Sequence, residues 1–211
     1  MNSSLPVCHQ NLFRLVETGN DKGYLQAPYC VLGTVFAVAA APDIPLPDVW
    51  LPWLIKPELG LPAVPQLTLI NDVAMACLQW QLQHMRDDNI TLPAAVQYST
   101  QVDSPLALWM QGLLLAHTRL DSVWQTAWRA MLSAQHADVG ALQKDLKHCL
   151  SVFSTFADIP FALQQARDKE QLATSLPRIF VSLPGVLATY VTLSGRLVEY
   201  LPNQFETFVK D

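Results

Sequence analysis

The sequence predicts an all-α fold, a single-domain irregular bundle of about seven to nine helices that spans residues 1–211. Three observations predict this fold class. Apolar residues recur at three- and four-residue steps through most of the chain, which is the spacing of one helix face. No stretch alternates apolar and polar residues convincingly enough for a sheet. No internal repeat, low-complexity tract or linker divides the 211 residues, a length that fits one large domain.

Composition narrows the classes of function. Apolar residues make up 51% and charged residues 15% of the chain, and the net charge is −5. The usual charged share is about 25%, so we expect exposed apolar surface, which favours a protein partner or self-association. Basic residues are scattered and form no run. Nucleic acid, whose binding needs a positive surface, is therefore not an expected partner.

The N-terminal segment and the most apolar segment predict a cytoplasmic protein without a membrane anchor. Residues 1–17 hold neither a basic leader nor an apolar run, as a secretory signal would. Residues 27–41 are the most apolar, but about 15 residues are fewer than the roughly 20 that span a bilayer. No basic amphipathic helix that would bind a membrane surface is evident. We expect reduced, buried thiols, as is usual in cytosolic proteins, at Cys8, Cys30, Cys77 and Cys149.

The first half of the chain predicts three helices. Residues 9–18 form the first candidate, which Gly19 ends. Pro28 and Pro42 bracket the second candidate. Because it is apolar on nearly every side, we expect it at the centre of the fold. The third runs over about 66–86, with apolar residues along one side.

Capping residues mark the helices of the second half. Ser104 followed by Pro105 predicts a helix start, because serine accepts from a free N–H group and proline has none. Ser122 opens a capping-box pattern for the next helix. Asp138 is expected to cap the helix after it. The last third predicts two helices that meet near Pro184.

Residues 43–66 hold six prolines, and three interpretations compete for them. They could form a flexible linker, an exposed proline-rich ligand or a structured connector. Leaving Trp50 and Trp53 in water would forfeit a large favourable burial energy. We therefore expect a structured connector whose tryptophan fills the core, with prolines that lower the entropy cost of an irregular path.

The same region resembles a known family. A helix with Gly33 and Ala37 precedes a proline-rich turn and a Trp-Leu-Pro sequence, with matching residues Pro42, Pro47, Trp50, Leu51, Pro52 and Leu54. A second helix supplies a Trp-x-x-Gly motif, Trp109 with Gly112. Together these motifs resemble the YecA/YgfB-like family of uncharacterised bacterial proteins, over roughly residues 10–200.

The resemblance implies an all-helical single domain without established catalytic residues. Leu32 stands where the family often has a histidine before the first glycine. Longer members end in a cysteine-rich zinc-binding module, which has no counterpart in these 211 residues. The resemblance therefore implies no zinc site in this chain.

Gly33 and Gly112 lie inside predicted helices, where glycine costs up to about 1 kcal/mol relative to alanine. A glycine in such a position is typical of a close approach between two backbones. We expect these two residues to mark where the two central helices meet.

No constellation of residues predicts catalysis, a metal site or a cofactor site. The adjacent pairs Cys8–His9 and His148–Cys149 point about 100° apart on a helix, so neither chelates from one face. The chain holds no nucleophile-elbow motif and no glycine-rich phosphate loop. His117, inside an apolar helix, is the titratable group of most interest. It predicts either a hydrogen-bonded core histidine or the wall of a small-molecule pocket.

Aromatic residues offer candidate contacts with a partner protein. Trp124 and Trp128 lie four residues apart on one helix, next to Arg129, and Trp53 belongs to the proline-rich segment. Tryptophan and arginine are enriched at interface hot spots. The alternative is that one or both tryptophans of the helix belong to the core.

We therefore expect a non-catalytic cytoplasmic protein-interaction or regulatory protein of undefined pathway, which binds a partner protein or forms a homodimer. The alternative is a small-molecule-binding protein or enzyme that uses a pocket between helices near His117.

Overall fold

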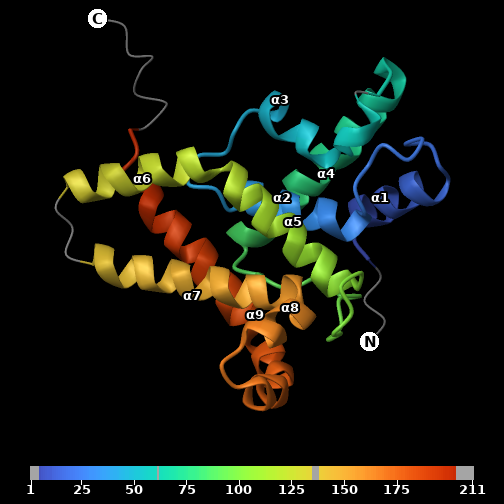
Figure 1. Ribbon diagram of the computed structural model, residues 1–211. Helices are drawn as coiled ribbons and strands as arrows, with labels where there is room; N and C mark the ends of the chain where they lie inside the picture. Colours follow the sequence, from blue (N-terminus) through green and yellow to red (C-terminus); the bar gives the residue numbers. More distant parts are fainter. Residues whose placement is uncertain (1–4, 61, 135–137, 203–211) are drawn as a thin grey trace, which may run out of the picture.

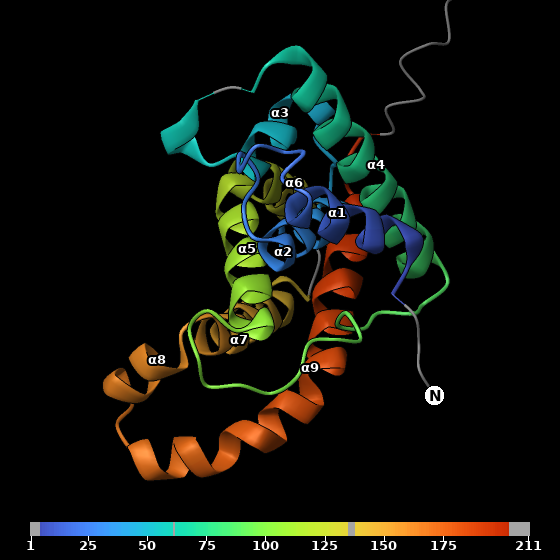
Figure 2. The ribbon, with the colours of Figure 1, turned by 90° about the vertical axis from the view of Figure 1, so that its right-hand side faces the viewer.

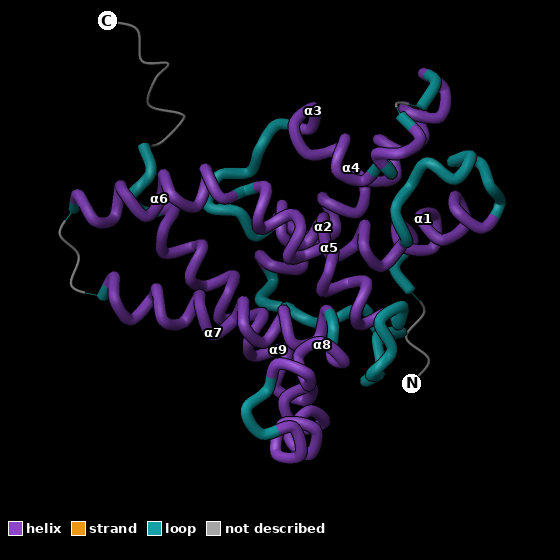
Figure 3. Tube along the Cα trace, in the orientation of Figure 1, coloured by secondary structure: helices purple, strands orange, loops and turns teal. Residues whose placement is uncertain are grey.

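The computed structural model describes residues 5–60, 62–134 and 138–202. Over these ranges it contains helices and loops and no strand (Figures 1 and 3), which confirms the all-α prediction. The helices are α1 Val7–Glu17, α2 Pro28–Ala39, α3 Pro47–Trp50, η1 Leu51–Leu54, η2 Pro57–Leu59, α4 Val64–Arg86, α5 Pro105–Arg119, α6 Asp121–Ser133, α7 Val139–Ala157, α8 Ile159–Gln165 and α9 Lys169–Val198. The predicted number of about seven to nine α-helices is confirmed in this part of the chain.

The helices pack in a continuous series. α1 lies on α4, α4 on α2, α2 on α5, α5 on α7, and α7 on α9, as Figures 1 and 2 show. α2 and α5 form the centre of the series and make the most extensive contact. Every residue of α2 from Val31 to Ala39 is buried, as expected for a helix that is apolar on all sides.

The predicted close approach at the two glycines is confirmed. A Cβ on Gly33 would overlap the backbone of Trp109 in α5, and a Cβ on Gly112 would overlap the backbone of Cys30 in α2. Thr34 Oγ1 also donates to the carbonyl oxygen of Gly112, at 3.2 Å. Each helix therefore presents a glycine where the backbone of the other passes.

The proline-rich segment is a structured connector, as expected. Trp50 has none of its surface exposed and belongs to the core. The connector pairs with the segment before α2, because Gln26 N donates to Leu54 O and Lys56 N donates to Tyr24 O, both at 2.8 Å. Its outer side still exposes large apolar residues, namely Ile44, Leu46 and Val49.

Ser104 caps α5 as predicted, accepting a hydrogen bond from Ala107 N at 3.2 Å. The predicted capping box at Ser122 is wrong, because α6 begins one residue earlier, at Asp121, and follows α5 after the single residue Leu120. Asp138 occupies the cap position of α7, but its side chain pairs with Arg196 of α9, at 3.2 Å. At the start of α7, a tertiary ion pair therefore takes the place of the predicted side-chain cap.

The prediction of two helices that meet near Pro184 is also wrong. α9 runs unbroken for 30 residues and contains both Pro177 and Pro184. A proline inside a helix removes one hydrogen bond and crowds the carbonyl one turn earlier. Both prolines are exposed, so the freed carbonyls lie on the solvent side, and α9 bends along its course (Figure 2).

Candidate functional site

The structure separates the four residues predicted to contact a partner. Trp124 and Trp128 are 2% and 6% exposed. Trp53 is half-buried on the connector, with Arg119 Cζ lying 5.6 Å from its ring centroid. Arg129 is exposed. The four residues therefore do not share one surface, and Trp124 and Trp128 both belong to the buried core cluster, as the alternative proposed.

Trp128 and Arg129 do share a groove between α6 and α7, with a volume of about 360 Å³. We call it the α6–α7 groove. α6 lines it with Gln125, Trp128, Arg129 and Leu132; α7 lines it with Gln143, Leu146, Lys147 and Leu150. Each wall uses positions i, i+3, i+4 and i+7, which form one face of a helix. The buried Trp128 forms part of the apolar floor, and Leu132 is 52% exposed at the rim.

Two cations line the α6–α7 groove, in a chain whose net charge is −5. Arg129 is held along α6, because its Nε donates to Gln125 O at 3.2 Å and its guanidinium to Thr126 Oγ1 at 3.3 Å. Lys147 is exposed and makes no ion pair within the described residues. None of the lining residues is acidic. The groove thus combines an apolar floor with positive charge.

His117 lies in an aromatic cluster of the core. Its Nδ1 is 2.9 Å from the hydroxyl of Tyr190, and its ring centroid is 5.0 Å from that of Trp124. Burial lowers the pKa of His117 from 6.5 to about 4, while Asp121, one helical turn later, partly opposes this shift. Within the part of the chain that the structure describes, His117 lines neither the α6–α7 groove nor any of the other three pockets. The geometry matches the core-histidine alternative.

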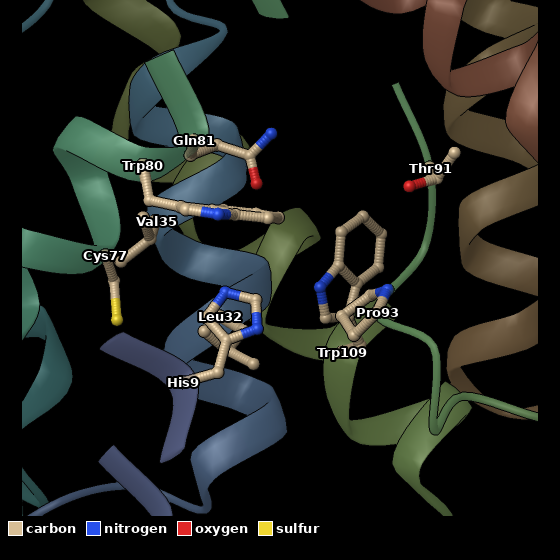
Figure 4. Close-up of a pocket in the computed structure, with 9 residues that line it drawn as sticks. All are labelled: His9, Leu32, Val35, Cys77, Trp80, Gln81, Thr91, Pro93 and Trp109. Atoms are coloured by element: carbon tan, nitrogen blue, oxygen red, sulfur yellow. The ribbon is translucent and has the colours of Figure 1, made fainter. Parts of the chain in front are cut away.

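A second histidine cluster, between α1 and α4, was missed from the sequence. Trp80 stacks on His84, with ring centroids 3.7 Å apart. The ring centroids of Trp80 and His9 lie 4.6 Å apart, and Figure 4 shows these two side chains. His9 is 3% exposed, and its Nδ1 has no hydrogen-bond partner among the described residues. Burial, with a smaller contribution from His84, lowers the pKa of His9 to about 4. The residues come from two distant segments, so no local spacing indicated the cluster.

His9 faces a small cavity that Cys77 and Trp109 also line (Figure 4). Its volume is about 10 Å³, which is about the space that one water molecule needs. The cavity is therefore too small for a metabolite.

Within the described residues, no three His, Cys, Asp or Glu side chains are grouped so as to hold a metal ion. One helix in the same part of the chain, α9, is long and apolar enough to cross a bilayer by length and composition. Only 28% of its most apolar window is buried, although α9 contributes Leu183, Leu187 and Tyr190 to the core.

No family model, curated protein or solved structure matches this chain. The resemblance to the YecA/YgfB-like family therefore stays a prediction. Four of its motif residues, Gly33, Trp50, Trp109 and Gly112, are buried in or around the α2–α5 contact. Packing gives each of these four residues a structural reason.

Proposed function

We propose that the protein is a non-catalytic interaction protein that binds an acidic amphipathic helix in the α6–α7 groove. The observation that supports this most is the matched set of four positions on each wall, with Arg129 and Lys147 beside an apolar floor. An amphipathic helix binds a groove through apolar residues at the same i, i+3, i+4 and i+7 spacing. Glutamates beside that stripe would face the two cations and fix the orientation of the helix.

The helices around the groove support the proposal, because they hold its two walls in place. The α2–α5 contact leaves no space for a side chain at either glycine, and α5 also packs on α7. α6 and α7 each pack on both α5 and α9. A groove whose two walls are held by the same pair of helices is preformed, which lowers the entropy lost on binding. We further propose, from the sequence alone, that the protein acts in the cytoplasm.

Charge reversal in the groove tests the proposal. Two labelled synthetic helices, identical except that one has glutamates and the other lysines beside a leucine stripe, would be titrated by fluorescence anisotropy. We expect the wild type to prefer the acidic helix by about tenfold, equivalent to about 1.4 kcal/mol. In the double variant Arg129→Glu/Lys147→Glu the preference should reverse. The preference of the wild type should also weaken as salt rises.

Lys144→Glu is the matched control. Lys144 is exposed on the same helix, α7, but does not line the groove, so this variant should keep the preference for the acidic helix. Equal affinity of the wild type for both peptides would contradict the proposal, as would an equal loss in Lys144→Glu. Sedimentation of the protein alone checks whether a second copy occupies the groove; a stable dimer that excludes both peptides would also overturn it.

A further inference from the structure

The strongest feature outside the α6–α7 groove is the contact between α1 and α4 at His9. α1 lies at one end of the packing series, where it packs mainly on α4 and has a smaller contact with α2 (Figure 2). The imidazole of His9 is buried in the contact with α4, with its ring centroid 4.6 Å from that of Trp80. The attachment of α1 therefore depends largely on the surface that His9 occupies.

The surroundings of His9 contain nothing that would stabilise a positive charge. Its Nδ1 has no hydrogen-bond partner among the described residues, and its ring faces a cavity of about 10 Å³ (Figure 4). The other residues that line this cavity are Leu32 and Val35 of α2, Cys77, Trp80 and Gln81 of α4, Thr91 and Pro93 of the segment after α4, and Trp109 of α5. None of them is acidic, and only Cys77 can ionise. An imidazolium at this position would be buried without a counterion, which strongly favours the neutral ring.

His84 brings a second imidazole to the same contact. Its ring stacks on Trp80 with centroids 3.7 Å apart, so His9 of α1 and His84 of α4 both lie against one indole. Charges on both rings would repel each other across the α1–α4 contact. The pKa of His9 agrees with this geometry, because burial, with a smaller contribution from His84, lowers it from 6.5 to about 4.

The turn after α1 provides a point at which α1 can separate. Gly19, two residues after the end of α1, has a φ of +66°, which glycine adopts without strain. From Asp21 onward the chain is held independently of α1. The buried Asp21 carboxylate accepts from Gly23 N at 3.2 Å and from Leu25 N at 3.1 Å, and Lys56 Nζ donates to Gly23 O at 2.9 Å. Movement of α1 about this turn would therefore leave the connector and α2 in place.

We propose that the α1–α4 contact is a pH-sensitive switch, in which protonation of His9 releases α1 while the other helices stay packed. The proton comes from solvent when α1 separates, and water then hydrates the imidazolium, as it cannot in the closed contact. Release uncovers the side of α4 that carries Cys77 and Trp80. The switch differs from acid unfolding of the whole chain because only one helix leaves.

Native-state hydrogen exchange of the full-length protein, followed by NMR at pH 6 and pH 5, tests this switch. The protection of α1 amides, such as those of Leu12 and Leu15, should fall roughly eightfold between these pH values. The reason is that the histidine binds a proton over this interval in the released helix, with its ordinary pKa of 6.5, but not in the closed contact. Amides of α5, such as those of Leu113 and Ala116, should stay at least tenfold more protected than those of α1 at both pH values.

Two variants identify the titrating group. His9→Leu should make the protection of α1 independent of pH over this interval. His117→Gln is the matched control, because His117 is also buried but lies in the aromatic cluster with Tyr190. This variant should keep the eightfold fall in α1.

Each measurement has a result that would overturn the proposal. In the wild type, equal protection of α1 and α5 would show that α1 opens only when the whole chain unfolds, and a protection of α1 that does not change with pH would exclude the switch. Loss of the pH dependence in His117→Gln, or its persistence in His9→Leu, would assign the titration to another group. The wild type and His117→Gln remain decisive even if His9→Leu fails to fold.

Discussion

Gly33 and Gly112 allow the two central helices to approach closely. Each lacks the Cβ that would otherwise overlap the backbone of the opposite helix. Backbone atoms cannot rotate away as a flexible side chain can, so the two helices would have to separate. The glycines therefore set the distance on which the neighbouring core contacts depend, including that between Phe36 and Trp109, whose ring centroids are 5.1 Å apart.

Alanine at these glycines tests that role. Gly33→Ala and Gly112→Ala should each lower the free energy of unfolding by roughly 3 kcal/mol, the upper end of typical overpacking costs. Gly195→Ala in α9 is the matched control, because no atom lies within 4 Å of its added Cβ. Helix propensity predicts that this variant is up to about 1 kcal/mol more stable. Urea denaturation measures all three; a similar effect at Gly33 and Gly195 would contradict the packing argument.

The two buried histidines predict a loss of stability in mild acid. The pKa values of His9 and His117 fall to about 4 in the folded chain, below the ordinary 6.5. Between those pH values the unfolded chain binds more protons, so the free energy of unfolding should drop as pH falls from about 6.5 to about 4. The upper limit is roughly 3 kcal/mol for each histidine.

Denaturant titrations at several pH values measure this loss. His117→Gln removes one of the two titrating groups, so its stability should depend less steeply on pH over the same window. The comparison uses the slope of the unfolding free energy against pH. It therefore remains valid even if losing the contact with Tyr190 lowers the stability at every pH. An unchanged slope in His117→Gln would show that His117 is not buried as a neutral base.

At the scale of the elements, the connector illustrates how a proline-rich segment can be part of the core. Trp50 is fully buried, whereas Leu46 is 70% exposed four residues earlier. Trp50→Ala should cost about 3–5 kcal/mol of unfolding free energy, as large core truncations do. Leu46→Ser should change it by less than about 0.5 kcal/mol. A small effect of Trp50→Ala, measured by thermal or urea denaturation, would restore the interpretation as an exposed ligand.

The sequence predicted the elements better than their junctions. Apolar periodicity and the Ser104 cap were sufficient to predict α2, α4 and α5. These helices form because their apolar faces are buried, and the sequence shows which faces are apolar. The break at Pro184 was not real, since a proline whose freed carbonyl faces water bends a helix without ending it. The start of α6 depended on its short connection to α5, which the capping-box pattern at Ser122 did not indicate.

The candidate site was less predictable for a physical reason. Trp124 and Trp128 lie on one side of α6, but sequence alone does not show whether that side meets solvent or the core. The groove requires α7 to place Lys147 near Arg129, and the two residues are 18 positions apart. The contact between His9 and Trp80 joins distant segments in the same non-local way.

In the molecule as a whole, α6 and α7, which line the groove, and the pair α1 and α4 lie at opposite ends (Figure 1). The α2–α5 contact separates them. Peptide binding in the groove should therefore leave α1 and α4 unperturbed.

A chemical-shift map of the ¹⁵N-labelled protein, titrated with the acidic helix, tests most directly whether the α6–α7 groove is the binding surface. If it is, the amide resonances that shift should belong mainly to residues 125–132 and 143–150, and the indole N–H resonance of Trp128 should shift with them. Amides of α1 and α4 should not move. Shifts centred on Trp53 or on the exposed side of α9, or no shifts at saturating peptide, would contradict it.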